Sequence, residues 1–452
     1  MKTAKQLDAD IIVIGGGAAG LMAAGRAGEV GARVLLLEKT DGCGKKILVS
    51  GKTRCNLTNS AELKKFISMY GTNGRFLHSA FHRFFRPELL SFMESHGLVT
   101  KVERGGRIFP VSDNAQDVVK VFKKYLITGK VQVKLNTKVT SISIQDKGIY
   151  SVKTQNGNFR CGAVIIAAGG ASWPATGSTG DGCKISAMLG HSIVKLKPAL
   201  APLIVHEQKL AQAMQGVSLR NVRATAFQGE ASRIDATLTP QIDYGRGEKK
   251  APRPPVIESR FGEMLFTHFG LGGPIILLMS LAVTEALEKG PVAILLDLKP
   301  ALTKDQLRLR LRRDLDKSGK RKIAGIIKEY LPAKMINPFV ALTGIDTEKP
   351  AHQINATERE KIIELFKALR FNVKSALPLE KAIVTAGGVA LAEIDPRTMA
   401  SKKAEGLYFC GEVMDIDADT GGYNLQAAFS TGYVAGESAA EYVTSFLQFR
   451  DD

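Results

Sequence analysis

The feature that most constrains the fold is a strand, a glycine-rich turn and a helix at the start of the chain. Residues 9–14, ADIIVI, are expected to form a buried parallel strand, and residues 18–31 to continue as a helix. The turn between them places Gly15, Gly17 and Gly20 in GxGxxG spacing. Glycines at this spacing permit a tight turn, close approach of the backbone to a pyrophosphate, and close packing of the helix on the strand.

The second strand of this unit supports the same interpretation. The helix beginning at Ala18 and Ala19 would point unpaired N–H groups and its dipole at phosphates. The segment ARVLLLE then ends in Glu38, 18 residues beyond Gly20. An acid at this position can accept hydrogen bonds from an adenosine ribose and disfavours a 2′-phosphate. The pattern therefore predicts dinucleotide binding; the alternative is a glycine-rich turn without a ligand in an α/β domain.

Three later segments favour FAD over a nicotinamide dinucleotide. A polar, glycine-rich loop follows at 39–59, where a nicotinamide dehydrogenase would continue with another βαβ unit. Residues 130–170 contain a three-stranded meander that leads into the apolar strand AVIIAAGG. Residues 406–443 give a strand, an acidic loop, a glycine pair and a helix. Two distant ends of the chain meeting at one cofactor are typical of an FAD enzyme.

Six ordered segments, spanning about residues 9 to 440, resemble the BaiN/YhiN-like (aminoacetone oxidase-like) flavoproteins, a bacterial family of FAD-dependent oxidoreductases. They are GxGxxG, SGKTRCNLTN, GRIFPVSDNAQDVV, ASWPATGSTGDG, GEMLFTHFGLGGP and GEVMDIDADTGGYNLQAAFSTG. One position departs from the family pattern SGxGRCN, because Thr53 stands where the family has glycine. A side chain there changes how closely the backbone can approach the cofactor.

The resemblance implies an α/β fold, in which a discontinuous, Rossmann-like FAD-binding domain carries an inserted β-rich domain and a small helical domain. The FAD-binding domain is expected at 1–195 and 375–452. The β-rich substrate domain is expected at 196–300, with a return segment at 346–374, and the helical insert at 301–345.

The expected FAD contacts come from these motifs. Ser50, Arg54 and Asn56 would donate hydrogen bonds to pyrophosphate or flavin, with Thr58 and Asn59 capping the next segment. The alternative is a polar turn that satisfies its own backbone. The full set of expected cofactor residues is Gly15, Gly17, Ala18, Ala19, Gly20, Glu38, Lys39, Lys46, Ser50, Gly51, Arg54, Cys55, Asn56, Val139, Ala168, Gly169, Gly170, Gly411, Glu412, Asp415, Gly421, Gly422, Tyr423, Asn424 and Leu425.

The roles of the C-terminal residues follow from their place in the last motif. Asp415 would bind ribityl hydroxyls, and the backbone of 421–425 would stabilise negative charge on a reduced flavin at a helix N-terminus. Two side chains are candidate proton donors. Cys55 lies in the polar loop, although a free cysteine is more often a small buried hydrophobe. His268 precedes a glycine-rich turn, although a structural histidine is the simpler interpretation.

The positive net charge of the chain suggests a negatively charged partner. The net charge of +18 favours attraction to nucleic acid, an anionic membrane or acidic substrates. Residues 245–260 form a basic, proline-containing loop, and residues 303–330 are predicted to form one helix with more bases than acids. A solvated helix face is the alternative to an anion-binding surface. The candidate RNA contacts are Arg308, Arg312, Arg313, Lys320 and Arg321.

The sequence thus predicts a cytoplasmic FAD-dependent oxidoreductase. No second GxGxxG follows a strand, so NAD(P)H would visit transiently as reductant. The resemblance implies reduction of conjugated C=C bonds, oxidation of small amines, or reduction of uridine to dihydrouridine in ribosomal RNA, and the charge favours uridine. A small enone or amine substrate remains an alternative, as does a flavin- or RNA-binding module without turnover. Five cysteines without a CxxC pair suggest no metal site, and no segment suggests a membrane span.

Overall fold

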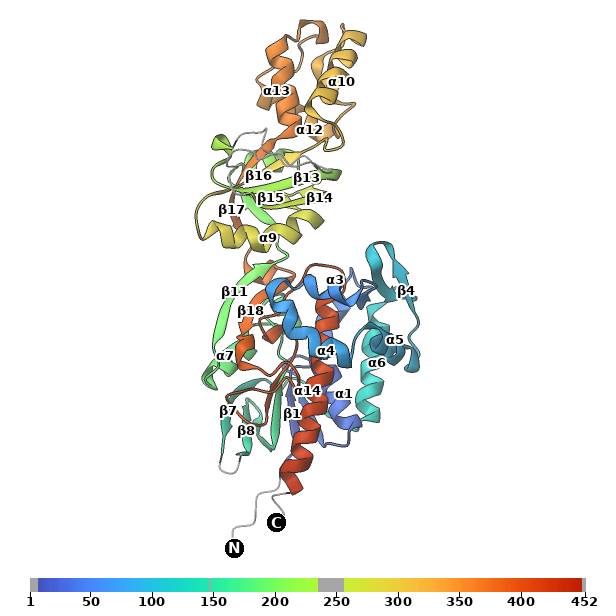
Figure 1. Ribbon diagram of the computed structural model, residues 1–452, viewed down its shortest axis with the longest axis vertical. Coiled ribbons are helices and arrows are strands. Elements are labelled where there is room, and N and C mark those ends of the chain that lie inside the picture. The colour runs from blue at the N-terminus through green and yellow to red at the C-terminus, as the bar shows by residue number, and fades with distance from the viewer. Residues whose placement is uncertain (1–6, 146–147, 235–255, 449–452) are drawn as a thin grey trace. The chain divides into compact units, whose positions relative to one another are not determined.

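The computed structural model describes residues 7–145, 148–234 and 256–448 (Figure 1). The chain divides into two compact units. Unit 1 comprises Met1–Lys197 and Ile383–Asp452, and unit 2 comprises Pro198–Ala382. The second unit is therefore an insertion in the sequence of the first.

The core of unit 1 is a five-stranded parallel sheet in the order β19-β10-β1-β2-β6. Its central strands are apolar and buried on both faces, as parallel strands covered by helices must be. The predicted strand–turn–helix–strand is confirmed. The strands are β1 (Ile11–Ile14), β2 (Val34–Leu37), β6 (Gln132–Lys134), β10 (Ala163–Ile166) and β19 (Leu407–Phe409).

Two helices from opposite ends of the chain, α1 (Ala18–Glu29) and α14 (Tyr423–Gln448), pack against each other (Figure 1). Glycine makes this contact close. A β-carbon on Gly432 would lie 2.4 Å from the carbonyl oxygen of Ala19, and one on Gly436 would lie 2.3 Å from that of Ala23. The C-terminal segment is thereby held beside the glycine-rich turn, which explains how distant motifs form one site.

Smaller sheets and short helices complete unit 1. The predicted meander is confirmed as β7 (Val139–Ile144), β8 (Tyr150–Thr154) and β9 (Gly157–Cys161). A second sheet has the order β3-β5-β4, and β11 pairs with β18. Their bounds are β3 (Thr58–Asn59), β4 (Thr100–Glu103), β5 (Arg107–Pro110), β11 (Ile193–Ala199) and β18 (Val384–Val389). The helices are α2 (Lys45–Val49), α3 (Leu63–Ser68), α4 (His78–Arg83), α5 (Arg86–Ser95), α6 (Ala115–Thr128) and α7 (Asp181–Met188).

Unit 2 contains a closed β-barrel and a helical part. The barrel order is β12-β15-β14-β13-β16-β17, and its strands are β12 (Leu203–Val205), β13 (Ser218–Gln228), β14 (Val256–Phe266), β15 (Gly270–Gly272), β16 (Val292–Asp297) and β17 (Leu369–Ala376). The helices are α8 (Gln208–Ala213), α9 (Pro274–Leu287), α10 (Lys304–Lys317), α11 (Ile323–Ile327), α12 (Ala333–Thr343) and α13 (Ala356–Lys367). The α/β class with a β-rich part agrees with the predicted fold.

Three details of unit 2 differ from the sequence analysis. The single helix expected at 303–330 is two helices, because the chain turns after Lys317 through Ser318 and Gly319. The expected β-rich return segment 346–374 contains α13 before β17, and Asn355 and Glu358 start this helix through a capping box. The expected loop 245–260 is strand from Val256 onward, and residues 245–255 lie outside the described residues.

Among the described residues, none of the helices is long and apolar enough to cross a membrane.

Candidate cofactor and active site

The three glycines of the glycine-rich turn have the different surroundings that the motif requires. Gly15 has a φ of +103°, and a β-carbon on it would lie 2.6 Å from the carbonyl oxygen of Ala167. A β-carbon on Gly20 would lie 1.9 Å from the carbonyl oxygen of Gly15. Around Gly17 no atom lies within 4 Å of that position. The first and third glycines therefore permit packing, and Gly17 leaves open space in front of the α1 N-terminus, where a pyrophosphate fits.

Glu38 is buried at the carboxyl end of β2. Its Oε2 accepts from the backbone N–H of Gly16 at 2.7 Å, and its Oε1 accepts from that of Thr40 at 2.8 Å. These bonds fix the carboxylate beside the glycine-rich turn. Each oxygen keeps a further lone pair, so the group can accept ribose hydroxyls.

The loop after β10 lies against the turn. A β-carbon on Gly15 would approach the Cα of Ala168 to 2.9 Å, and one on Gly170 would lie 2.4 Å from Oγ1 of Thr385. That Oγ1 accepts the N–H groups of Ala171 and Ser172 at 2.9 and 3.0 Å. Bare backbone is thus required here, which explains the Ala-Ala-Gly-Gly ending of the strand. Val139, the first residue of β7, is also buried in unit 1.

A half-buried ionic network joins this loop to α2 and to the turn after β19. The ammonium of Lys46 donates to Oγ of Ser172 at 2.8 Å and to Oε2 of Glu412 at 2.7 Å. Oε1 of Glu412 accepts from the N–H of Thr385 at 2.8 Å. Lys46 and Glu412 could be predicted from the sequence, whereas Ser172 and Thr385 could not, since no local pattern shows that they share a partner.

The polar loop SGKTRCNLTN contains a rare backbone conformation. Gly51, Lys52 and Thr53 have φ values of +56°, +57° and +68°, and Cys55 has +62°. A left-handed φ is costly for a residue with a side chain, and most of all for a β-branched one. Non-glycine residues held in this region cluster at functional sites. The left-handed value at Thr53 also accounts for the glycine that the family pattern has there.

Two of the three expected donors in this loop are engaged by the protein. The guanidinium of Arg54 donates to Glu103 at 2.8 Å and to Asp113 at 3.2 Å, and it lies 4.1 Å over the ring of Phe109. The hydroxyl of Ser50 donates to the carbonyl of Ile47 at 2.7 Å. In this structure these bonds hold the loop in shape, and donation from Ser50 and Arg54 to the cofactor stays a prediction.

The end of the loop leaves buried acceptors without partners. Among the described residues, Oδ1 of Asn56, Oγ1 of Thr58 and Oε1 of Gln426 are buried and make no hydrogen bond. Thr58 does not cap the next segment as expected, whereas Oδ1 of Asn59 accepts from the N–H of Ala61 at 3.0 Å. Buried polar atoms without partners are costly, so a ligand with hydrogen-bond donors fits this place. The residues present therefore fit FAD.

The C-terminal turn at Gly421 and Gly422 packs against the same polar loop. Gly422 has a φ of +98°, and a β-carbon on it would lie 2.4 Å from the carbonyl oxygen of Thr58. The side chain of Asn59 donates to the carbonyl of Gly421 at 3.0 Å. Asn424 exchanges two hydrogen bonds with the backbone of Ala418 at 2.9 and 3.0 Å. The N-terminus of α14, with Tyr423 and Leu425, is thereby fixed beside the polar loop.

Asp415 lies in the acidic loop that precedes this turn in the chain. Its backbone carbonyl and its Oδ2 accept from the amide of Asn73 at 2.8 and 3.1 Å. The amide of Asn73 orients this carboxylate, a role that sequence analysis did not identify. Gly411 has a φ of +74° and contacts Ala19, which brings the start of this turn to the α1 N-terminus.

The two candidate proton donors lie in different units. Cys55 is fully buried, and burial raises the pKa of its thiol to about 12, against a smaller opposing effect of the Ser50 hydroxyl. His268 is exposed in the turn between β14 and β15, with its ring edge-on to Phe269. The Cys55 thiol therefore stays protonated at neutral pH, and His268 is accessible to solvent.

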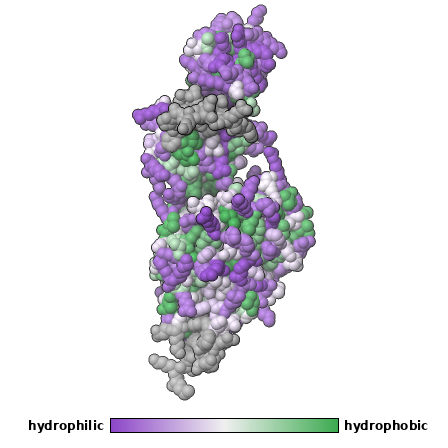
Figure 2. Space-filling view, viewed as in Figure 1, coloured by the Kyte–Doolittle hydropathy of each residue, from purple (hydrophilic) through white to green (hydrophobic). Residues whose placement is uncertain are grey.

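The basic segment is more fully paired than the sequence suggested. Glu360 of α13 accepts two hydrogen bonds from Arg308 at 2.6 and 2.9 Å. Arg312 and Arg313 pair with Asp316 and Asp314 at 3.9 and 3.3 Å, and Arg321 pairs with Glu329 at 2.7 Å. Glu360 lies on α13, outside residues 303–330, so the sequence of that segment alone does not show that Arg308 is paired. Figure 2 shows a mostly hydrophilic surface over this helical part on the face in view.

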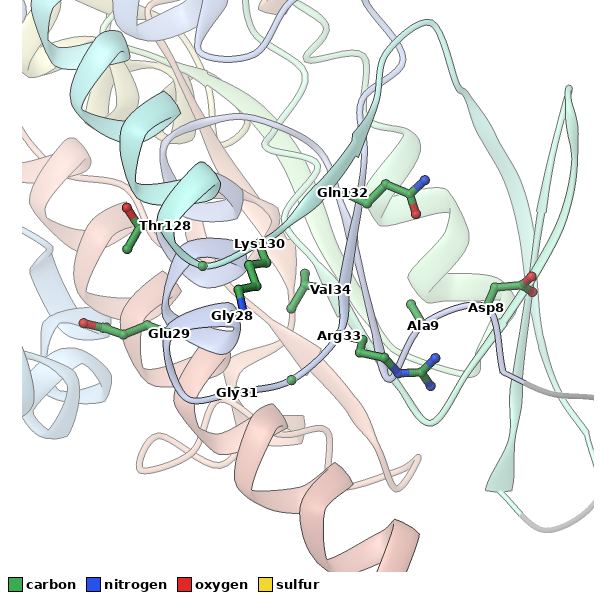
Figure 3. A pocket seen from close by; sticks show the side chains of 12 residues that line it. Asp8, Ala9, Gly28, Glu29, Gly31, Arg33, Val34, Thr128, Lys130 and Gln132 are labelled. Atoms are coloured by element: carbon green, nitrogen blue, oxygen red, sulfur yellow. The ribbon is translucent and has the colours of Figure 1, made fainter.

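A hollow of about 570 Å³ lies at the opposite edge of the parallel sheet (Figure 3). It is lined by the segments that precede β1, β2 and β6 and by the ends of α1 and α6, including Asp8, Glu29, Arg33, Lys130 and Gln132. Ligands of open α/β sheets bind at the carboxyl ends of the strands, so this hollow is separate from the cofactor site. Among the described residues, no group of three or more His, Cys, Asp or Glu side chains could hold a metal ion.

Comparison with known proteins covers nearly the whole chain. Residues 9–438 match the family described as HI0933-like protein Rossmann domain. A 3-dehydro-bile acid delta(4,6)-reductase of Clostridium scindens is 32% identical, over 95% of this chain and 98% of the relative. Ribosomal RNA dihydrouridine synthases of Escherichia coli and Haemophilus influenzae are 28% and 27% identical, over 95% and 94% of this chain and 97% of each relative.

Proposed function

Because the chain belongs to the HI0933-like family, and so is an FAD-dependent oxidoreductase like the BaiN/YhiN-like flavoproteins it resembles, we propose that it reduces a ring C=C bond conjugated to a carbonyl group. The observation that carries this proposal is the chemistry shared by the names of its full-length relatives. Saturation of a 4,6-dienone and conversion of uridine to dihydrouridine both add two hydrogens across such a bond.

Two substrate classes follow. Uridine in ribosomal RNA is favoured by the net charge of +18, since positive charge attracts phosphates. A small cyclic enone is favoured by the 32% identity to the bile acid reductase, and by the carboxylates that already pair with all four arginines of α10. We take ribosomal uridine as the first candidate, with NAD(P)H as transient reductant.

The chain's own residues have three tasks. The turn at Gly17 and the carboxylate of Glu38 would hold the pyrophosphate and the ribose. Bound FAD supplies the two-electron transfer. The side-chain oxygens of Asn56, Thr58 and Gln426 would orient it, because among the described residues these three atoms are buried and make no hydrogen bond. Cys55 and His268 remain the candidate donors of the second hydrogen, as a proton.

An anaerobic reoxidation assay tests the proposal. The flavin of the purified full-length protein is first reduced with NADH or NADPH, and then mixed with ribosomal RNA lacking the modification or with a steroid 4,6-dien-3-one. We expect reoxidation by one of them, with dihydrouridine or the saturated ketone as product. Failure of both to reoxidise a reduced flavin would contradict the proposed reaction. Mass spectrometry of ribosomal RNA from a strain lacking the gene then decides the class: unchanged dihydrouridine content would exclude the RNA substrate.

The proton donor is tested by Cys55→Ala and His268→Ala. We expect both variants to keep FAD, and the true donor's variant to slow reoxidation by the substrate by about 10²–10⁴-fold. The rate of flavin reduction by NAD(P)H serves as the control, because it needs no proton on the substrate. If both variants reoxidise at the wild-type rate, neither residue delivers the proton.

A further inference from the structure

Trp173 combines exposure with a strained backbone. It is the single tryptophan of the chain, its side chain is 43% exposed, and its φ and ψ are +55° and +62°. A bulky residue in the left-handed region is an energetically unfavourable outlier. Such strain persists where the surrounding structure imposes it.

The neighbours of Trp173 hold its backbone in this conformation. Its carbonyl accepts from the N–H and the hydroxyl of Thr176 at 2.9 and 2.8 Å. The preceding Ser172 is fully buried and is fixed by Thr385 and Lys46 at 3.0 and 2.8 Å. Rigid anchors on both sides therefore present a large aromatic ring to solvent. Within the part of the chain that the structure describes, that ring stacks on no other ring.

The position of this turn indicates what the ring contacts. The turn that starts at Trp173 ends at Gly177, where a β-carbon would lie 3.7 Å from Oε1 of Glu38 and 3.2 Å from Cγ2 of Thr40. Just beyond it, the ammonium of Lys39 donates to Thr179 and Asp181 at 2.5 and 2.8 Å. The loop therefore lies against the carboxylate that fits an adenosine ribose.

We propose that Trp173 is the stacking surface for the adenine ring of the FAD cofactor. The turn that begins at Trp173 ends beside Glu38, so a base attached to a ribose held by Glu38 would lie near this turn. Stacking of a base on an aromatic side chain stabilises binding and needs no hydrogen-bond pattern. The proposal rests on the cofactor site alone and is independent of the substrate. It also makes Trp173 a residue that distinguishes FAD from FMN, which has no adenine.

Tryptophan fluorescence tests the contact directly, because the whole signal comes from one residue. Full-length protein is freed of flavin and shown by circular dichroism to keep the fold of the holoprotein. ADP and FMN are then added separately, and the accessibility of the indole to acrylamide is measured. We expect ADP to protect the indole and FMN to leave it accessible. Protection by FMN alone, or by neither ligand at saturation, would overturn the proposal.

Variants give a second measurement that does not depend on fluorescence. By calorimetry, Trp173→Leu is expected to weaken ADP binding about tenfold, which corresponds to ~1.4 kcal/mol, whereas Trp173→Phe keeps a ring and loses less than about threefold. In the holoprotein, Trp173→Leu is expected to speed loss of FAD on dilution. Phe261→Leu, at a 56% exposed aromatic of β14 in unit 2, is the control and should change neither value. Equal ADP affinity in all four proteins would contradict the proposal.

Discussion

At the scale of single residues, the site is defined by backbone positions that side chains cannot occupy freely. The three glycines of the turn illustrate this, because the same motif gives Gly15 and Gly20 packing roles and gives Gly17 an empty space. The polar loop goes further, with Lys52, Thr53 and Cys55 all in the left-handed region. Such a backbone is maintained by its clamps, above all by Arg54 between Glu103 and Phe109.

Substitution of the turn glycines should separate binding from folding. In Gly17→Val the new β-carbon meets no protein atom within 4 Å, so we expect a normally folded protein that has lost its flavin. In Gly20→Ala the new β-carbon would lie 1.9 Å from a backbone oxygen, so we expect a protein that folds poorly. Flavin absorbance and thermal unfolding of the two variants check this. A yellow Gly17→Val protein would contradict the assignment of the pyrophosphate site.

The strain at Thr53 predicts a stabilising substitution. Thr53→Gly removes the left-handed penalty, partly offset by the entropy of glycine, so we expect a gain of about 0.5–1 kcal/mol in the free energy of unfolding. Urea titration measures it. Thr140→Gly, at an exposed position in β7 without positive φ, is the matched control and should destabilise. A loss of stability in Thr53→Gly would show that its side chain contributes more than the strain costs.

At the scale of elements, sequence patterns predicted what is local and missed what is brought together by folding. The βαβ unit and the meander could be predicted, because their signals lie in consecutive residues. The bonds of Glu412 to Lys46 and Thr385 could not be predicted, since its partners come from α2 and β18. The same limit explains Arg308, whose partner Glu360 lies on a different helix.

One contact between elements of unit 1 should make stability depend on pH. The buried ring of His191, just after α7, lies between Glu393 at 3.1 Å and Ser401 at 2.9 Å, and its pKa is lowered because burial outweighs the attraction of Glu393. The unfolded chain therefore binds a proton more readily than the folded one. Stability should fall as pH drops below about 6.5, the usual pKa of histidine.

Urea midpoints at pH 7.5 and 5.5 test this effect in the wild type and in His191→Gln. We expect the urea midpoint to decrease less between pH 7.5 and pH 5.5 in the variant than in the wild type, because glutamine does not titrate. Glu393 does not interfere, since its bond to Lys403 lowers its pKa to about 2, so it stays ionised across this range. Equal decreases of the urea midpoint in both proteins would mean that groups other than His191 cause the pH dependence.

At the scale of the whole molecule, the cofactor residues and the helical part belong to different units with separate hydrophobic cores. The core of unit 1 includes Ile12, Leu21 and Phe429, and the core of unit 2 includes Phe266, Leu311 and Phe366. All the residues that fit FAD lie in unit 1. A ligand stabilises only the folded state that binds it.

Calorimetry with and without excess FAD should therefore resolve two unfolding transitions. FAD should raise the temperature of one of them and leave the other unchanged. At a free concentration 100 times its Kd, a ligand adds about 2.7 kcal/mol to the unit that binds it. We expect this shift in the unit 1 transition, its absence in Gly17→Val, and an unmoved transition for unit 2. Residues 198–382 expressed alone should reproduce the unmoved transition, because the barrel and the helical part have their own core. A single transition that moves as a whole with FAD would instead mean that the two units unfold cooperatively.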